Sequence, residues 1–347
     1  MFAKKIVAGA ALLALAAGAQ AQVKLYGTLD MSVGSFKSVG GKAKTAVESG
    51  NMMTSYIGFS GSEDLGGGLK AEFALETFIG GDTGANVTNQ AGNFWSRGSS
   101  IALSGGFGKV ALGQYDNALF IAGYTYNPFG SSMTFSPTMR HLYDLGSTRV
   151  GLPGALATVG FDTGWVNSIT YETPTFSGFN ASVQFAPKET SANGSKNSYT
   201  LAGSYNAGPL SLAAVYVDAG IANAAYLAEQ TVVNLNGSYD FGVVKAFLQY
   251  TDISYESNSL YAGFADSAKL FQVGASVPVS PAGTVMVSFG QAKLSAPNQG
   301  SAKDNIFSLG YDHMLSKRTD AYVVVTNEKL TSFKGATSFA VGIKHNF

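Results

Sequence analysis

The chain has no cysteine and very little charge. Charged residues make up only 13% of its 347 residues, with 22 basic and 22 acidic side chains, whereas soluble domains average about 25% charged residues. The absence of cysteine excludes a disulfide framework and cysteine-based metal sites. The balanced charge lacks the basic excess of a nucleic-acid-binding protein, so no nucleic-acid partner is expected. Such a surface is too uncharged for an ordinary soluble protein.

Long apolar runs are also missing. Hydrophobic residues make up 46% of the chain, yet after the first residues they form no run of the ~18 needed for a membrane-spanning helix. This excludes a helical membrane protein. Glycine and aromatic residues are abundant instead, with 43 Gly, 17 Tyr and 23 Phe. Diffuse hydrophobicity with many glycines and aromatics is typical of a transmembrane β-barrel.

The first 21 residues have the pattern of a secretory signal peptide. Lys4 and Lys5 form a basic start, residues 6–17 are apolar, and Ala19–Ala21 is a small-residue cleavage site. An N-terminal membrane anchor is the alternative, disfavoured because the apolar core is short. We expect export across the inner membrane and a mature barrel domain of residues 22–347.

Apolar and polar residues alternate along much of the mature chain. In the last ten residues, Phe339, Val341, Ile343, His345 and Phe347 share one face. The same period of two recurs in several other segments: residues 23–33, 69–75, 179–185, 233–240, 271–277 and 307–312. This period predicts β-strands with one apolar face. In a barrel, that face meets lipid and the polar face lines water.

The connections between these strands alternate between short and long. Short turns rich in Gly, Pro, Asn and Asp are expected at 62–68, 104–108, 173–178, 206–209, 240–242, 278–283 and 313–317. Longer polar loops are expected at about 37–50, 80–93, 116–164, 188–197, 219–230, 253–269, 292–302 and 328–336. Seven turns and eight loops connect sixteen antiparallel strands, the even number that a closed bacterial barrel requires. Aromatic residues near the short turns should form a girdle at the periplasmic membrane surface: Tyr26, Tyr205, Tyr239, Phe241, Tyr311 and Phe347.

The third long loop, residues 116–164, is exceptional at about 49 residues. Loops beyond about 15 residues are uncommon and usually functional. Residues 117–123 could form a short helical turn. A barrel of about sixteen strands has an aqueous lumen, and we expect this loop to fold inward and narrow it. The alternative is a loop lying on the outer surface.

Several stretches, in order along the whole mature chain, resemble the trimeric general porins of Gram-negative outer membranes, in the form found in Neisseria and Burkholderia relatives. They are VKLYGTLD at 23–30, SYIGFSGSEDLGGGLKA at 55–71, FGKVALG at 107–113, NSITY at 167–171, FSGF at 176–179, HMLSKRT at 313–319 and GIKHNF at 342–347. The resemblance implies a sixteen-stranded antiparallel transmembrane β-barrel with an inward-folded third loop, and a homotrimer in contact with outer-membrane lipid and lipopolysaccharide. It also implies that Phe347 belongs to the signal read by the barrel-assembly machinery.

One departure from that family concerns its arginines. The family usually has Arg at the positions of Tyr56 and Gln114, where those arginines typically face the lumen, and Arg97 stands where its other wall arginine is expected. Strict alternation puts Arg97 on the apolar face unless Gly98 allows a bulge. Because a lipid-facing Arg costs about 2–4 kcal/mol, we expect Arg97 in the lumen or near the rim. The missing arginines call the family's frequent anion preference into question.

The expected function is passive diffusion of ions and small hydrophilic solutes. Pore width excludes large solutes, and charged and polar side chains set a field across the constriction. The candidate constriction residues are Lys24, Tyr56, Lys70, Glu72, Arg97, Gln114, Asp116, Arg140, Asp144 and Arg149.

Other functions are less well supported. The histidines, His141, His313 and His345, are too scattered to suggest a metal site, and pairing His141 with Ser147 gives only a forced hydrolase site, so we expect no enzyme, metal or cofactor. A substrate-specific channel for a small sugar or organic acid stays possible, with a row of loop aromatics: Phe120, Tyr124, Tyr126, Phe129 and Phe135. A barrel adhesin is disfavoured because adhesins more often have about eight strands.

Overall fold

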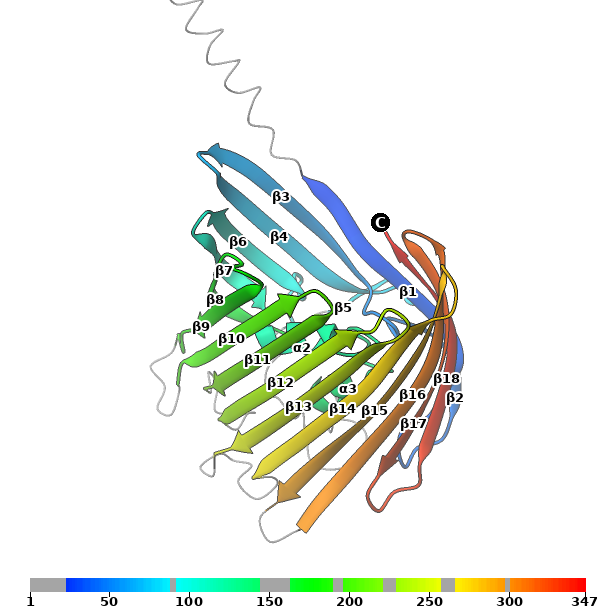
Figure 1. Ribbon diagram of the computed structural model, residues 1–347. Coiled ribbons are helices and arrows are strands. Elements are labelled where there is room, and N and C mark those ends of the chain that lie inside the picture. The colour runs from blue at the N-terminus through cyan, green and yellow to red at the C-terminus, as the bar shows by residue number, and fades with distance from the viewer. Residues whose placement is uncertain are drawn as a thin grey trace, which may run out of the picture.

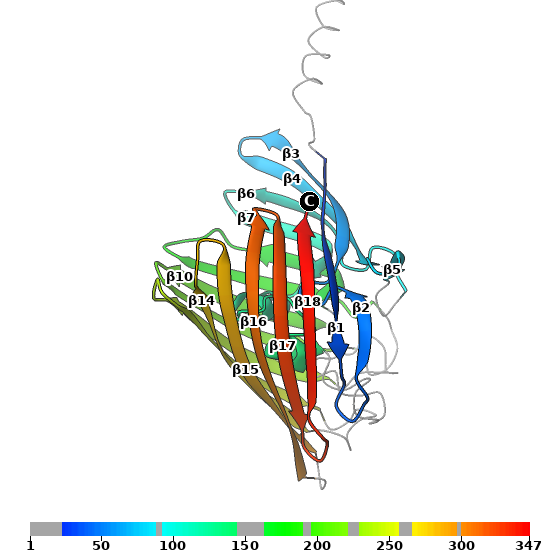
Figure 2. The ribbon, with the colours of Figure 1, turned by 90° about the vertical axis from the view of Figure 1, so that its right-hand side faces the viewer.

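One antiparallel β-sheet closes on itself in the computed structural model of the chain (Figures 1 and 2). The structure describes residues 23–87, 92–143, 163–189, 196–220, 229–256, 266–296 and 300–347. The expected signal peptide lies outside these ranges. Among the described helices, none has the length and apolarity to cross a membrane.

The elements follow the chain in a simple meander. In the first half they are β1 (Lys24–Phe36), β2 (Lys44–Ser49), β3 (Tyr56–Gly66), β4 (Leu69–Gly80), β5 (Ala85–Val87), β6 (Gly98–Gly105), β7 (Gly108–Asp116), α2 (Ala118–Thr125), α3 (Pro137–Tyr143), β8 (Gly164–Glu172) and β9 (Phe179–Ala186). In the second half they are β10 (Ser198–Ala207), β11 (Leu210–Ala219), β12 (Gln230–Asp240), β13 (Lys245–Tyr255), β14 (Ser267–Pro278), β15 (Gly283–Ala296), β16 (Gly300–Ser316), β17 (Thr319–Leu330) and β18 (Ala336–Asn346).

These 18 strands of the described residues occupy sixteen positions around the barrel. β2 pairs with the second half of β1 and β3 pairs with its first half, so β2 and β3 share one position. β5 and β6 share another beside β4. β1 pairs with β18 from Thr28↔Asn346 to Ser35↔Phe339, which closes the barrel beside the C-terminus (Figure 2). The expected sixteen-stranded antiparallel barrel is confirmed.

Two of the expected connections need the largest corrections, and a third, at 80–93, contains the short strand β5. The seven short turns lie where the turn residues predicted them, but the first long loop is shorter than 37–50 because residues 44–49 form β2. The sheet position that β2 and β3 share is interrupted at residues 50–55, where Gly50 has a φ of +79°. β15 and β16 also extend into the expected loop at 292–302. In both places strand pairing continues past the polar residues that suggested a loop.

The two faces of the sheet have the expected chemistry. Outward side chains such as Leu235 and Leu248 are 51% and 56% exposed. Inward polar side chains on the same or neighbouring strands, Asn234, Gln249 and Gln272, are at most 1% exposed. The outer face therefore presents apolar side chains to lipid, as a barrel in a membrane requires.

Part of the inner wall is apolar, which strict alternation did not predict. Val217, Val232 and Ile253 point inward and are fully buried. They belong to a cluster that includes Leu119 and Leu142 from the third loop. The loop covers this patch of wall and removes it from water, so apolar residues are favoured on both sides of the contact.

The aromatic girdle needs one correction. On the outer face Phe179 and Tyr205 pack with ring centroids 4.3 Å apart, and Tyr239 and Phe241 pack at 4.6 Å. Tyr26 instead lies on the inward face of β1, because it shares the parity of buried Thr28. It belongs to the lumen and not to the girdle.

A buried carboxylate fixes the interruption between β2 and β3. Asp30 is fully buried on the inward face of β1. Its Oδ2 accepts hydrogen bonds from the backbone N–H of Met52 (2.5 Å) and Met53 (3.0 Å), and its Oδ1 accepts one from the Tyr322 hydroxyl (2.7 Å). Asp30 therefore fixes segment 50–55 to β1 and joins it to Tyr322 on β17, the strand beyond β18.

We expect Asp30→Ala to destabilise the barrel by about 3 kcal/mol or more, because hydrogen bonds to charged groups contribute about 1.5–3 kcal/mol each. Urea unfolding of the refolded protein, followed by the heat-dependent shift in SDS gels, measures this loss. Asp82→Ala, in the exposed turn after β4, is the control and should behave as the parent protein. An unchanged midpoint for Asp30→Ala would refute the anchoring role.

Candidate functional site

The third loop enters the lumen through its first helix. α2 lies inside the ring of strands, behind β10–β12 in Figure 1. Asn117 caps the helix by accepting the Leu119 N–H at 2.9 Å. Its side-chain amide also donates to Gln184 (2.9 Å) and Thr200 (2.7 Å) on the inner wall. The short helix predicted at 117–123 is therefore present as Ala118–Thr125, tied to the wall from its first residue.

The second helix of the loop is fastened to a different part of the wall, formed by β14 to β17. The Thr138 N–H and hydroxyl both donate to the Gln272 carbonyl oxygen, at 2.9 and 2.8 Å. Arg140, 5% exposed, binds the carboxylate of Glu328 at 2.5 Å. His141 lies 3.4 Å from Asp304. The inward fold expected for this loop is thus what the structure has over residues 117–143.

Between the loop and the wall lies a cavity of about 580 Å³. The loop contributes Phe120, Tyr124, residues 128–131 and Met133, and the wall contributes side chains from most of the barrel's circumference. The charged residues in the lining are Arg97, Asp312 and Lys344. The cavity is therefore a water-accessible space bounded on one side by the inserted loop.

Arg97 is held on the wall by a small cluster. Its guanidinium binds Glu76, lies 4.0 Å from the Asp116 carboxylate and stands over the Tyr56 ring at 4.5 Å. Tyr26 donates its hydroxyl to Glu76 at 2.5 Å. Arg97 precedes β6 and faces the lumen, away from lipid. Glu76 was not among the candidates, although its parity with Glu72 on β4 could have identified it.

A second charged group lies across the cavity. Lys344 on β18 pairs with Asp320 on β17 at 3.1 Å, and Asp312 on the neighbouring β16 lines the same space. None of these residues was a candidate. The alternation of the last strand places Lys344 opposite the apolar face, which is the signal that could have found it.

The remaining candidates within the described residues lie apart from this cavity. Lys24 and Lys70 lie at inward positions near the short turns, and Glu72 pairs with Lys109 at 2.9 Å. Gln114 donates to the Ser96 carbonyl at 2.9 Å and so supports the backbone just before Arg97. Arg140 is paired with Glu328, as described above. The last two candidates, Asp144 and Arg149, lie outside the described residues.

The loop aromatics divide into two groups. Phe120, Tyr124 and Phe129 line the cavity. Tyr126 and Phe135 are 3% and 0% exposed and pack between loop and wall. Burial, with a smaller contribution from the Asp116 carboxylate, raises the pKa of the Tyr124 hydroxyl. Tyr124 therefore stays neutral at physiological pH and adds no charge to the lining.

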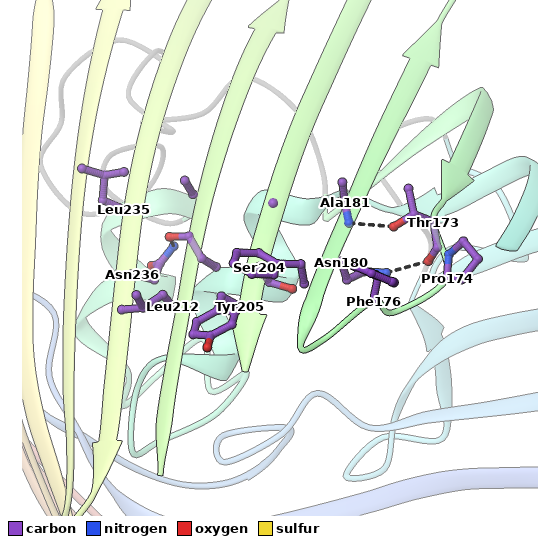
Figure 3. A pocket seen from close by; sticks show the side chains of 14 residues that line it. Thr173, Pro174, Phe176, Asn180, Ala181, Ser204, Tyr205, Leu212, Leu235 and Asn236 are labelled. Carbon is purple, nitrogen blue, oxygen red and sulfur yellow. Dashed lines mark hydrogen bonds between the residues drawn. The ribbon is translucent and has the colours of Figure 1, made fainter. Parts of the chain in front are cut away.

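A second hollow lies on the outer face of the barrel, between β9 and β12 near the short turns (Figure 3). It has a volume of about 930 Å³ and its apolar lining includes Phe176, Leu212 and Leu235. All three side chains are well exposed. Because this face meets lipid, the hollow is not part of the channel.

Comparison with known proteins agrees with this geometry. A family model described as Gram-negative porin matches residues 8–331. Outer membrane porin protein 32 of Delftia acidovorans is 33% identical, over 92% of this chain and 87% of that protein. An outer membrane porin protein of Bordetella pertussis is 30% identical, over 99% of this chain and 100% of that protein.

Solved structures lead to the same family. The anion-selective porin from Comamonas acidovorans superposes with a TM-score of 0.72 at 28% identity, covering 94% of this chain and 100% of that one. The trimer form of OmpT from Vibrio cholerae shares the fold, with a TM-score of 0.66 at 13% identity over 94% of this chain and 99% of its own. The chain therefore belongs to the Gram-negative porin family: it is an outer-membrane β-barrel channel for passive diffusion and not an enzyme.

Proposed function

We propose that permeating ions and small hydrophilic solutes pass through the cavity between the third loop and the wall, and that this cavity is the constriction of the channel. The observation that supports this is the double attachment of the loop, through Asn117 on one side and Thr138 and Arg140 on the other. A loop fixed at both helices cannot swing aside to let large solutes pass. Pore width at this level then sets the size limit.

Within the constriction, Arg97 and Asp116 carry charge at the wall, and Tyr56 and Gln114 hold Arg97 in place. Lys24, Lys70 and Glu72 line the wider vestibule at the short-turn end. Arg140 acts by fastening the loop. Asp144 and Arg149 add one negative and one positive charge to the third loop. We also propose that residues 1–21 are removed on export.

Deleting residues 127–159 of the third loop tests the constriction directly. We expect the single-channel conductance in planar bilayers to rise about twofold, because conductance follows the cross-section of the narrowest segment. A deletion in an outer loop that does not enter the lumen, residues 331–334, is the control and should leave conductance unchanged. If the loop 127–159 deletion also conducts like the parent protein, the constriction lies elsewhere.

We further propose that the chain assembles as a homotrimer, as its family resemblance implies. An aromatic group on the outer face is suited to such a contact: Trp95 packs edge-on against Phe59 and Phe94, and Phe94 is 57% exposed. Contacts with lipopolysaccharide and with the barrel-assembly machinery follow from the same resemblance. Conductance steps that occur in threes, and SDS-resistant trimers on gels, are the expected observations.

A further inference from the structure

The cavity lining itself has two cations, Arg97 and Lys344, and one carboxylate, Asp312, but carboxylates outnumber cations once the ion-pair partners of these two cations are counted. Arg97 lies against Glu76 and Asp116, and Lys344 pairs with Asp320. Asp312 lines the same space. Among the described residues of these two clusters there are thus four carboxylates for two cations. A fifth carboxylate, Asp30, is the neighbour of Lys344 in the β1–β18 register and is fully buried.

The rest of the lining supplies no positive charge to offset this excess. It consists largely of methionines and aromatic rings from the wall and the loop: Met52, Met53, Met133, Met286, Phe78, Phe120, Tyr124 and Phe129. Walls of low dielectric concentrate the field of the charges that are present. A permeating ion close to these side chains therefore experiences the net negative charge.

Neighbouring parts of the lumen do not reverse the balance. At the short-turn end, four inward lysines are matched by four inward carboxylates: Lys24, Lys70, Lys109 and Lys245 by Asp64, Glu72, Glu172 and Asp240. On the loop, Arg140 is neutralised by Glu328. Residues 144–162, outside the described ranges, carry one arginine and two aspartates in the sequence and so add no net positive charge.

We propose that this channel selects cations over anions, with Glu76, Asp116, Asp312 and Asp320 as the residues that determine the preference. The inference rests on the proposed passage through the cavity. It sets the chain apart from its structural relative in Comamonas acidovorans, which is described as anion-selective. The solutes favoured are therefore inorganic cations and small organic amines.

The size of the preference follows from the potential in the constriction. Charged clefts with low-dielectric walls reach potentials of several kT, and a potential of only about one kT enriches cations and depletes anions to give a ratio of about sevenfold. At high salt the Debye length falls to about 3 Å at 1 M, so the preference should weaken. These two features distinguish a fixed-charge effect from simple sieving.

The test is a reversal-potential measurement in planar bilayers under a KCl gradient, since potassium and chloride have similar mobility in water. We expect the purified parent protein to favour potassium by about sevenfold at low salt. A reversal potential of the opposite sign overturns the proposal. So does a ratio near one that no charge substitution changes.

Variants test the residues in both directions. The double variant Asp312→Asn/Asp320→Asn removes the excess charge and should bring the ratio close to one. Lys344→Met adds net negative charge and should raise the ratio above that of the parent protein, which keeps the proposal testable if the double variant fails to assemble. Glu63→Gln, at an exposed position near the end of β3, is the matched control and should change nothing.

The outcome is separable from that of the constriction proposal. If deleting residues 127–159 raises conductance while the parent protein prefers chloride, only the cation preference is wrong. If that deletion has no effect, the constriction proposal fails together with the assignment of the selective residues.

Discussion

Replacing Arg140 with methionine should release the second helix of the third loop from the barrel wall. The Arg140 guanidinium binds Glu328 at 2.5 Å, with both side chains less than 10% exposed. Removing one partner of a buried ion pair typically costs about 3–5 kcal/mol, because the other charge stays buried without compensation. At about 1.4 kcal/mol per factor of ten, local opening of α3 should become at least about a hundredfold more populated.

Hydrogen exchange measured by mass spectrometry detects this opening directly. Amides of residues 137–143 should exchange far faster in Arg140→Met than in the parent protein, while amides of β12 and β13 keep their protection. The double variant Arg140→Met/Glu328→Met removes both charges and should recover most of the protection, since an apolar pair can replace a buried ion pair. Parent-like exchange in the single variant would show that Thr138 and the apolar contacts suffice to hold the helix.

Altering the closure at the C-terminus should have the second large effect, this time on assembly. The Phe347 N–H donates to the Gly27 carbonyl at 3.1 Å, and the Gly27 N–H donates to the Phe347 carbonyl at 3.3 Å. A β-carbon at Gly27 would come within 2.7 Å of the Phe347 ring and 2.3 Å of the Tyr56 carbonyl oxygen. Gly27 therefore leaves the space in which the last residue docks onto the first strand.

We expect deletion of Phe347, and separately Gly27→Val, to lower the yield of folded barrel at least about tenfold, because the lost hydrogen bonds and ring burial together are worth about 3 kcal/mol. The yield is read as heat-modifiable protein in the outer-membrane fraction. Gly203→Val is the matched control: a β-carbon there meets only the Asn180 carbonyl oxygen, at 4.0 Å.

The conservative substitution Phe347→Tyr keeps both the aromatic ring and the backbone hydrogen bonds. This variant should therefore assemble almost normally. Normal yields after deletion of Phe347 would mean that the β1–β18 register alone closes the barrel. Failure of Gly203→Val to assemble would mean that any larger residue in place of an outer-face glycine is harmful. The effect of Gly27→Val would then not be specific to the contact with Phe347.

The barrel itself could be predicted from the sequence because its rules are local. Each strand residue faces either lipid or lumen, so the period of two along segments such as 233–240 reports orientation one residue at a time. Glycine, proline, asparagine and aspartate mark the short turns for equally local reasons. Strand number, the direction of the apolar face and the exceptional length of the third loop all follow from such patterns.

The lining of the channel could not be predicted in this way. The Asp30–Tyr322 bond joins residues 292 positions apart, and the Arg140–Glu328 pair joins residues 188 positions apart. No local pattern encodes which charge meets which across a closed sheet. Alternation even misleads where the loop covers the wall, since inward Val217 and Ile253 are apolar because they face the loop and not water.

The sequence by itself therefore determined a porin-type barrel with sixteen strands and a loop too long to be a simple connection. Only the tertiary structure decided where that loop is fastened, that Arg97 faces the lumen beside Glu76, and that Lys344 and Asp312 complete the lining. The reason is physical. Solvation by lipid or water acts on each residue separately, whereas the field in the pore depends on distances between side chains that only barrel closure brings together.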